Sequence, residues 1–298
     1  MHQSISIVIP TIEEESLFSL VEKLRQTIGK DIEIIIVDKS SDTYYNRLKS
    51  TGAIVIRQRD KGVESAIMQG LRRAKGNILA SIDADETHDI SGIVDGVKLV
   101  ESGKADLVLG NRMGSLEQGS MDAYIKVGNS VLSWMFGKLY KTEVHDVLTG
   151  LFVMRRGAFD SIREVEPYRA GIAFFAIELA RLGYRVREVD IKYYKRRHGK
   201  SKLTKSKFAY GVNVASHLIR QLRDYSPLLV FGGLGVIVGL IGLAIGIGVL
   251  SDFLHSGVFV QTGRALAAFM LVVLGFLFFV AGLILDMLLE IEKRMVKK

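Results

Sequence analysis

The sequence predicts an α/β domain with an open, doubly wound and mostly parallel sheet, followed by two transmembrane helices. Residues 1 to about 200 alternate short β-branched runs with segments of helical periodicity. The last third holds two long apolar stretches, although the chain carries a formal net charge of +8. Soluble basic proteins that bind nucleic acid are rarely so hydrophobic as this chain, whose mean hydropathy is +0.24. Nucleic acid is therefore not an expected partner.

Five runs rich in Val, Ile and Leu predict strands that are buried on both faces of a parallel sheet. They are "ISIVIP" (5–10), "IEIIIVD" (32–38), "AIVIRQ" (53–58), "NILASID" (77–83) and "DLVLGN" (106–111). Apolar residues at helical spacing fill the first and third intervals between these runs. This rhythm predicts βαβ units joined by right-handed crossovers.

Two apolar stretches near the C-terminus predict membrane-spanning helices. Leu228–Leu250 and Ala265–Leu285 contain no charged residue, and each meets the length of roughly 20 residues needed to cross a bilayer. Gly235 and Gly239 form a GxxxG pattern, which is typical of close helix packing. Lys and Arg flank the pair of helices, whereas the connecting loop has only Arg264. The positive-inside rule therefore predicts that the N-terminal domain and both termini are cytoplasmic.

These patterns divide the chain into an α/β domain (1–200), a basic amphipathic segment (201–226) and a two-helix hairpin with a basic tail (227–298). In the middle segment the apolar residues share one helical face, with Lys and Arg around them. Such a helix is expected to lie in the plane of the lipid headgroups, with a plain connecting helix as the alternative. The chain has no cysteine, which excludes disulfides and thiolate metal sites.

Acidic residues gather where three of the predicted strands end. Glu13 and Glu14 follow the first strand, Asp38 ends the second, and Asp83 and Asp85 follow the fourth. Ligands of open α/β sheets bind outside the carboxyl ends of the strands. Paired carboxylates suit Mg²⁺ or Mn²⁺, which also bridge to substrate phosphates. The sequence therefore predicts a divalent cation at this edge of the sheet.

Basic residues occur where they could face a diphosphate. Arg112 ends the fifth predicted strand, and "RRHGKSK" (196–202) gathers four cations around one glycine. A metal ion together with Arg and Lys donors is the usual means of neutralising a leaving phosphate. The alternative role of "RRHGKSK", a lipid-headgroup anchor, is compatible with this one.

Six stretches, taken together and in order, resemble the family 2 GT-A glycosyltransferases, specifically the polyprenyl-phosphate glycosyltransferases that include dolichyl-phosphate mannose synthase. They are "VIPTIEEE", "IIIVDKSSD", "DADETHD", "GNR", "DVLTGLFVMRR" and "RRHGKSK", spread over residues 8–202. The resemblance implies a GT-A catalytic domain and Mg²⁺ or Mn²⁺ as cofactor. It also implies inverting transfer of a hexose from a nucleotide-diphosphate sugar, GDP-mannose or UDP-glucose, to dolichyl or polyprenyl phosphate at the lipid bilayer.

The resemblance assigns roles by position. Pro10, Thr11 and Glu14 would line the nucleotide base pocket, and Asp38 would read the base or the ribose. Asp83 would contact the nucleotide side and Asp85 the metal, with both counted as metal residues. Arg112 and Arg196, with Lys202, would bind the diphosphate or the acceptor phosphate. Asp146 would be an acidic residue near the acceptor, and Ser201 would belong to the loop that closes on it.

The chain departs from the family pattern at three positions. Glu13 replaces the usual Asn, Lys39 replaces the second acidic residue of V-D-D, and Thr87 stands where mannose synthases often carry a metal-binding Gln. Glu86, or Thr87 through water, is then the candidate for completing the metal shell.

Two alternatives compete with this interpretation. A processive polysaccharide synthase usually carries Q-x-x-R-W, but the one tryptophan, Trp134, lacks that context. We expect Trp134 to be a core or membrane-facing aromatic on a helix over 122–140. The other alternative is a non-catalytic membrane adaptor with a degenerate nucleotide-sugar fold, which the intact Asp83, Asp85, Arg112 and Arg196 argue against.

Overall fold

The computed structural model describes residues 4–165, 172–196, 227–258 and 262–296, together with Val212 and Ser216. The chain forms two compact units, Met1–Ser216 and His217–Lys298. Apart from Val212 and Ser216, the amphipathic segment predicted over 201–226 lies outside the described residues.

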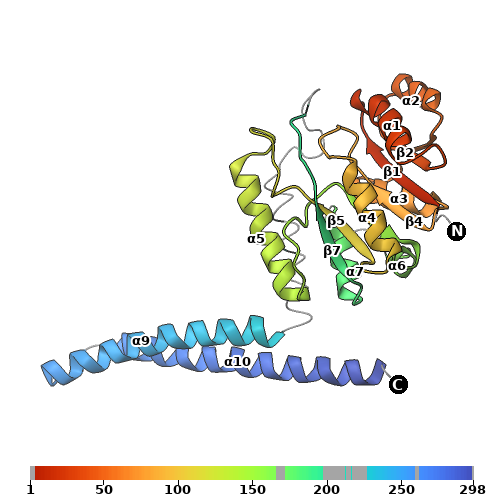
Figure 1. The fold of residues 1–298 in the computed structure, drawn as a ribbon. Helices are drawn as coiled ribbons and strands as arrows, with labels where there is room; N and C mark the ends of the chain where they lie inside the picture. The colour runs from red at the N-terminus through yellow and green to blue at the C-terminus, as the bar shows by residue number, and fades with distance from the viewer. Residues whose placement is uncertain are drawn as a thin grey trace. The chain divides into compact units, whose positions relative to one another are not determined.

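The first unit is built on a seven-stranded sheet with the order β3-β2-β1-β4-β6-β5-β7. Figure 1 shows this unit, with β1, β2, β4, β5 and β7 labelled. The strands are β1 (Ile5–Thr11), β2 (Glu33–Asp38), β3 (Ile54–Arg57), β4 (Ile78–Ser81), β5 (Leu107–Asn111), β6 (Phe152–Arg155) and β7 (Val186–Asp190). All five predicted strands are present, within one or two residues of their expected bounds. Only β6 runs antiparallel to its neighbours, so the predicted mostly parallel sheet is confirmed.

The helices of this unit cover both faces of the sheet. They are α1 (Ser16–Thr27), α2 (Asp42–Leu48), α3 (Val63–Arg73), α4 (Ser91–Glu101), α5 (Ala123–Tyr140), α6 (Arg156–Ile162) and α7 (Ala173–Arg181), with a short 3-10 turn η1 (Lys49–Thr51). Ile7 and Ile9 of β1 share a buried core with Leu20 of α1 and Ile93 of α4. The opposite face carries α3, which approaches so closely that a Cβ on Gly70 would lie 2.4 Å from Val8 Cγ1. Burial on both faces explains why these strands are apolar throughout.

The parallel pairing brings several strand ends to one edge of the sheet. The strands β1, β2 and β4 end together because β1 pairs parallel with both of the others. β5 has the same direction, since β6 lies antiparallel to both β4 and β5. Asp38, the Asp83–Asp85 loop and Arg112 follow these ends, so the predicted convergence of polar residues on one edge is present.

The second unit consists of two long helices, α9 (Gly233–Ser256) and α10 (Thr262–Val296), preceded by a π-helical turn η2 (Leu228–Gly232). Both contain candidate membrane spans, Val230–Ser256 and Thr262–Leu288, as judged by length and composition. A Cβ on Gly235 would lie 2.4 Å from the carbonyl oxygen of Gly275, and one on Gly275 would lie 2.5 Å from that of Gly235. The two backbones therefore meet at glycine, as small-residue packing between apolar helices requires.

Candidate active site

The loop after β4 is held against the segment that follows β7. The Tyr194 amide donates a hydrogen bond of 2.8 Å to the Thr87 carbonyl oxygen, and His88 forms an isolated antiparallel bridge with Tyr193. This pairing brings Arg196 to the acidic loop, although 111 positions of sequence separate it from Asp85.

Asp85 meets Arg196 directly. Arg196 Nη2 lies 2.5 Å and Nε 3.1 Å from the same oxygen, Oδ2 of Asp85. The other oxygen, Oδ1, accepts hydrogen bonds from the Thr87 hydroxyl at 2.7 Å and from the Thr87 amide at 3.2 Å. Burial acts to raise the pKa of Asp85, but the surrounding positive charge and these hydrogen bonds hold that pKa below its ordinary value. Asp85 is therefore an ionised carboxylate whose Oδ2 faces a cation.

Asp83 lies in a different electrostatic environment from Asp85. Burial, together with the facing charge of Asp85, raises the pKa of the Asp83 carboxyl to about 7. The backbone of Gly150, in the "DVLTG" stretch, approaches this carboxyl group closely. A Cβ on Gly150 would lie 2.0 Å from Oδ2 of Asp83 and 2.8 Å from Oδ1. Gly150 thus leaves the space that the carboxylate fills.

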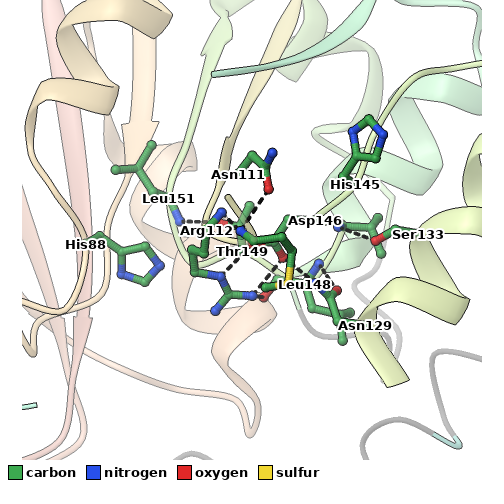
Figure 2. A network of polar contacts seen from close by, with 12 residues as sticks. His88, Asn111, Arg112, Asn129, Ser133, His145, Asp146, Leu148, Thr149 and Leu151 are labelled. Carbon is green, nitrogen blue, oxygen red and sulfur yellow. Dashed lines mark hydrogen bonds and ion pairs between the residues drawn. The ribbon is translucent and has the colours of Figure 1, made fainter. Parts of the chain in front are cut away.

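Arg112 and Asp146 form a buried ion pair (Figure 2). Arg112 Nε and Nη2 lie 2.7 Å and 2.8 Å from the two oxygens of Asp146, and the Arg112 amide donates to Oδ2 at 3.0 Å. Asn129 of α5 donates to Oδ1 at 2.9 Å, so the fully buried Asp146 has both oxygens engaged. Burial opposes ionisation of Asp146, but Arg112 lowers its pKa, and Asp146 in turn raises the pKa of Arg112. The pair is a fixed guanidinium anchored by a fixed carboxylate.

His88 is buried beside this pair. Its ring meets Tyr193 edge to face, with 5.2 Å between ring centroids. Burial, together with the charge of Arg112, lowers the pKa of His88 to about 4, so the ring is neutral at neutral pH. Nδ1 lies 3.2 Å from the Thr87 hydroxyl, whereas Nε2 has no hydrogen-bond partner among the described residues.

A cavity of about 210 Å³ opens at this edge of the sheet. Asp83, Asp85 and Arg196 line it. The other residues lining the cavity are Pro10, Thr11, Ile12, Glu14, Lys39, Gln58, Gly62, Val63, Ala66 and Ala84. The predicted base-pocket residues Pro10, Thr11 and Glu14 therefore share one cavity with the acidic pair.

Asp38 does not line this cavity. It is fully buried, and its Oδ2 is paired with Arg57 Nη1 at 2.9 Å. Oδ1 accepts hydrogen bonds from the hydroxyl and amide of Ser40. The neighbouring Lys39 and Gln58 line the cavity instead. Glu86, a candidate for the metal shell, is bonded to Ser19 and Lys23 on α1.

Three of the predicted site residues are not among those that line the cavity. Ser201 and Lys202 lie outside the described residues, and Arg112 lies beside the cavity without lining it. Asn129 and Gly150 were not predicted as site residues, because their roles arise from contacts that no local sequence pattern encodes. The signal nearest to them was the "DVLTG" stretch, which contains Gly150 itself.

The donor set fits a hard divalent cation. Within the described ranges, no three His, Cys, Asp or Glu side chains converge on a common point. Asp83 and Asp85 would therefore supply two ligands, and substrate phosphates and water the rest, which is the usual arrangement for Mg²⁺. The contact between Asp85 Oδ2 and a guanidinium indicates that this oxygen is directed at positive charge.

Comparison with known proteins identifies the family. A sequence model of the family described as glycosyl transferase family 2 matches residues 6–163, more than half of the chain. The chain belongs to this family. It is therefore a glycosyltransferase, and the alternative of a non-catalytic adaptor is wrong.

Two curated relatives of this glycosyltransferase have names that include a polyprenyl phosphate, and a third is named as a hexosyltransferase. Dolichol-phosphate mannosyltransferase of Pyrococcus furiosus is 25% identical over 283 residues, which cover 85% of this chain and 73% of that protein. Undecaprenyl-phosphate 4-deoxy-4-formamido-L-arabinose transferase of Edwardsiella ictaluri is 27% identical, covering 81% and 74%. The low-salt glycan biosynthesis hexosyltransferase Agl6 of Haloferax volcanii is 30% identical over 166 residues, which span 53% of this chain and 40% of Agl6.

Solved structures share the fold of the glycosyltransferase. Glucosyl-3-phosphoglycerate synthase of Mycobacterium tuberculosis, in complex with Mn²⁺, UDP and phosphoglyceric acid, has a TM-score of 0.57 and 20% identity, covering 74% of this chain and 78% of that one. Mannosyl-3-phosphoglycerate synthase of Rubrobacter xylanophilus also has a TM-score of 0.57 at 20% identity, covering 74% of each chain. The predicted GT-A fold class is thereby confirmed.

Proposed function

We propose that the chain transfers a hexose from GDP-mannose or UDP-glucose to dolichyl or another polyprenyl phosphate at the cytoplasmic face of a membrane. The observation that carries the proposal is the cavity in which Asp83 and Asp85 meet Arg196, in a chain that also has two candidate membrane spans. A polyprenyl tail stays in the bilayer, so the enzyme must bring its site to the membrane surface. Similarity to two polyprenyl-phosphate transferases over more than four fifths of the chain supports this acceptor.

The mechanism follows from charge. A divalent ion held by Asp83 and Asp85 would, when bound, neutralise the leaving diphosphate. Arg196 supplies further positive charge in the same cavity, and Arg112 adds a fixed guanidinium beside it. These donors are preorganised, so they need no rearrangement when charge develops on the leaving group.

A catalytic base is not needed. An oxygen of the acceptor phosphate forms the bond to the anomeric carbon while the bond to the nucleoside diphosphate breaks, which inverts the configuration. A phosphate monoester has a second pKa of about 6, so it is mostly dianionic near neutral pH. Asp146 therefore has no proton to remove, and its two oxygens are occupied by Arg112 and Asn129. We assign Asp146 the role of positioning Arg112.

The outer face of α5 supports a position at the membrane. Val127, Val131 and Trp134 recur at helical spacing and are 65%, 51% and 64% exposed. Lys126 and Lys138, also exposed, flank them. Tryptophan with lysine neighbours is favoured where an apolar helix face meets lipid headgroups. Trp134 is thus exposed among the described residues instead of buried in the core, which supports the membrane-facing role expected for it.

The test is a donor and acceptor screen with the full-length protein in lipid nanodiscs. Labelled GDP-mannose, UDP-glucose and other nucleotide sugars are each offered with Mn²⁺ and a short polyprenyl phosphate, and lipid-linked product is separated by extraction. We expect one donor to give product, with inverted configuration, and Asp85→Asn to abolish it. Asp95→Asn, which changes an exposed carboxylate on α4 paired with Lys98, is the matched control. Transfer to phosphoglyceric acid but not to polyprenyl phosphate would show that the acceptor class is wrong.

A further inference from the structure

The two oxygens of Asp85 are engaged in an unequal way. Arg196 places two nitrogens on Oδ2, instead of one on each oxygen as in the two-pronged pairing that Arg and carboxylate groups often form. Oδ1 is already occupied by the hydroxyl and amide of Thr87. Thr87 therefore holds Oδ1, and Oδ2 is the oxygen that meets positive charge.

The hydrogen-bond directions around Thr87 follow from its single hydroxyl proton. The Thr87 amide donates to Oδ1 and Arg196 donates to Oδ2, so both oxygens of Asp85 are acceptors, and the Thr87 hydroxyl donates to Oδ1 over 2.7 Å. The Thr87 oxygen then accepts at its contact with His88 Nδ1, which lies 3.2 Å away, and the Tyr193 side chain is a further hydrogen-bond partner of Thr87. His88 consequently carries a proton on Nδ1, and this holds for both the neutral and the charged ring.

His88 is held firmly enough to fix this chain of hydrogen bonds. It is 3% exposed, its ring lies edge to face against Tyr193, and its backbone bridges the same residue. A phenylalanine would fill the same space but could not form the contact between Nδ1 and the Thr87 hydroxyl, so packing alone does not account for the imidazole.

We infer that Thr87 and His88 are positioning residues that orient Asp85 so that Oδ2, and not Oδ1, binds the divalent cation. The inference rests on the proposed function, because it assigns the cation to Asp85. Thr87 thus acts through the carboxylate, as a hydrogen-bond donor, instead of joining the metal shell itself or through water. Partners of this kind typically contribute about 10- to 100-fold to metal affinity.

The experiment measures Mn²⁺ binding by electron paramagnetic resonance, which detects the free ion, in the full-length protein in nanodiscs with and without UDP or GDP. Thr87→Val keeps the side-chain shape and removes the hydroxyl, whereas Thr87→Ser keeps the hydroxyl. His88→Phe keeps the ring against Tyr193 and removes the Nδ1 proton, whereas His88→Asn retains an N–H at nearly the same place. Thermal denaturation of each variant reports whether it folds.

We expect Thr87→Val to raise the dissociation constant for Mn²⁺ by about 10- to 100-fold and His88→Phe to raise it by a smaller factor. Thr87→Ser and His88→Asn should restore most of the affinity. Wild-type affinity in both Thr87→Val and His88→Phe would overturn the inference, and so would a wild-type protein that binds no Mn²⁺. If Thr87→Val does not fold, His88→Phe decides alone, because it leaves Thr87 in place.

The two proposals fail in different ways. A wild-type protein that binds Mn²⁺ but forms no glycolipid with any donor contradicts the proposed function and leaves the roles of Thr87 and His88 standing. A protein that forms glycolipid while both pairs of variants bind Mn²⁺ equally contradicts only the inference about positioning.

Discussion

Gly150→Ala is expected to disable the site without unfolding the domain. The new Cβ would lie 2.0 Å from Oδ2, 2.5 Å from Cγ and 2.8 Å from Oδ1 of Asp83. All three distances are below ordinary contact, so rotating the carboxylate about its own axis does not relieve the overlap. The group must shift by roughly 1 Å, and a displacement of this size in a catalytic site can cost about 100-fold in rate.

The assay combines turnover, Mn²⁺ affinity and thermal stability in the full-length protein. For Gly150→Ala we expect kcat/KM to fall by about 100-fold and Mn²⁺ affinity to fall with it. Overpacking of this kind destabilises a domain by about 1–3 kcal/mol, so the protein should still fold. The matched control is Gly157→Ala in α6, where a Cβ would meet no atom within 4 Å. Wild-type turnover and Mn²⁺ affinity in Gly150→Ala would refute the reasoning, because Asp83 would then not need its present position.

Three further outcomes are expected. Because the pKa of Asp83 is raised to about 7, its carboxyl must lose a proton before it can bind a cation. Mn²⁺ affinity should therefore rise from about pH 5 to pH 8 and then level off. Asp83→Asn should remove this pH dependence, and a wild-type affinity that does not change with pH would contradict the prediction. Lys39→Met should raise the KM for the nucleotide sugar with little change in Tm, whereas Asp38→Asn should chiefly lower Tm. A raised KM in Asp38→Asn together with a lowered Tm in Lys39→Met would show instead that Asp38 binds the nucleotide. Trp134 is the chain's one tryptophan, so its fluorescence in nanodiscs should be quenched by brominated lipid, and quenching only by aqueous iodide would place α5 away from the bilayer.

The strands were predictable where burial on both faces makes them apolar throughout. β1, β2, β4 and β5 have that property, and their sequence runs gave bounds close to the observed ones. β6 and β7 were missed for two physical reasons. β6 takes its place by antiparallel pairing with β4 and β5, which lie far from it in the sequence, and no local pattern encodes such pairing. β7 lies at the edge of the sheet and is only partly buried, so charged residues interrupt its apolar ones.

The site was predictable to the extent that it depends on strand ends. Asp83 and Asp85 follow a buried strand, and the rule that ligands bind at the carboxyl edge placed them there. The contact between Asp85 and Arg196 depends instead on backbone pairing between residues 87–89 and 192–194, which sequence spacing does not reveal. Asn129 was missed because a buried amide in the middle of a helix has no pattern of its own, and its role appears only once Asp146 lies beside it.

For nucleotide recognition, the role that the family pattern assigns to Asp38 disagrees with the contacts that Asp38 makes in the structure. The resemblance assigned the base or ribose to Asp38, yet Arg57 and Ser40 occupy both of its oxygens, and the side chain is fully buried. Because Asp38 is fully buried, a ribose hydroxyl could reach it only if Arg57 or Ser40 moved aside, and the hydrogen bond from Arg57 is charge-assisted, roughly twice as strong as a neutral one. Lys39 needs no such exchange, because it already lines the cavity where the family usually has a second acidic residue. Replacing that negative charge with a positive one changes which groups of a nucleotide can be bound there, from hydroxyl and amide donors to carbonyl and phosphate acceptors.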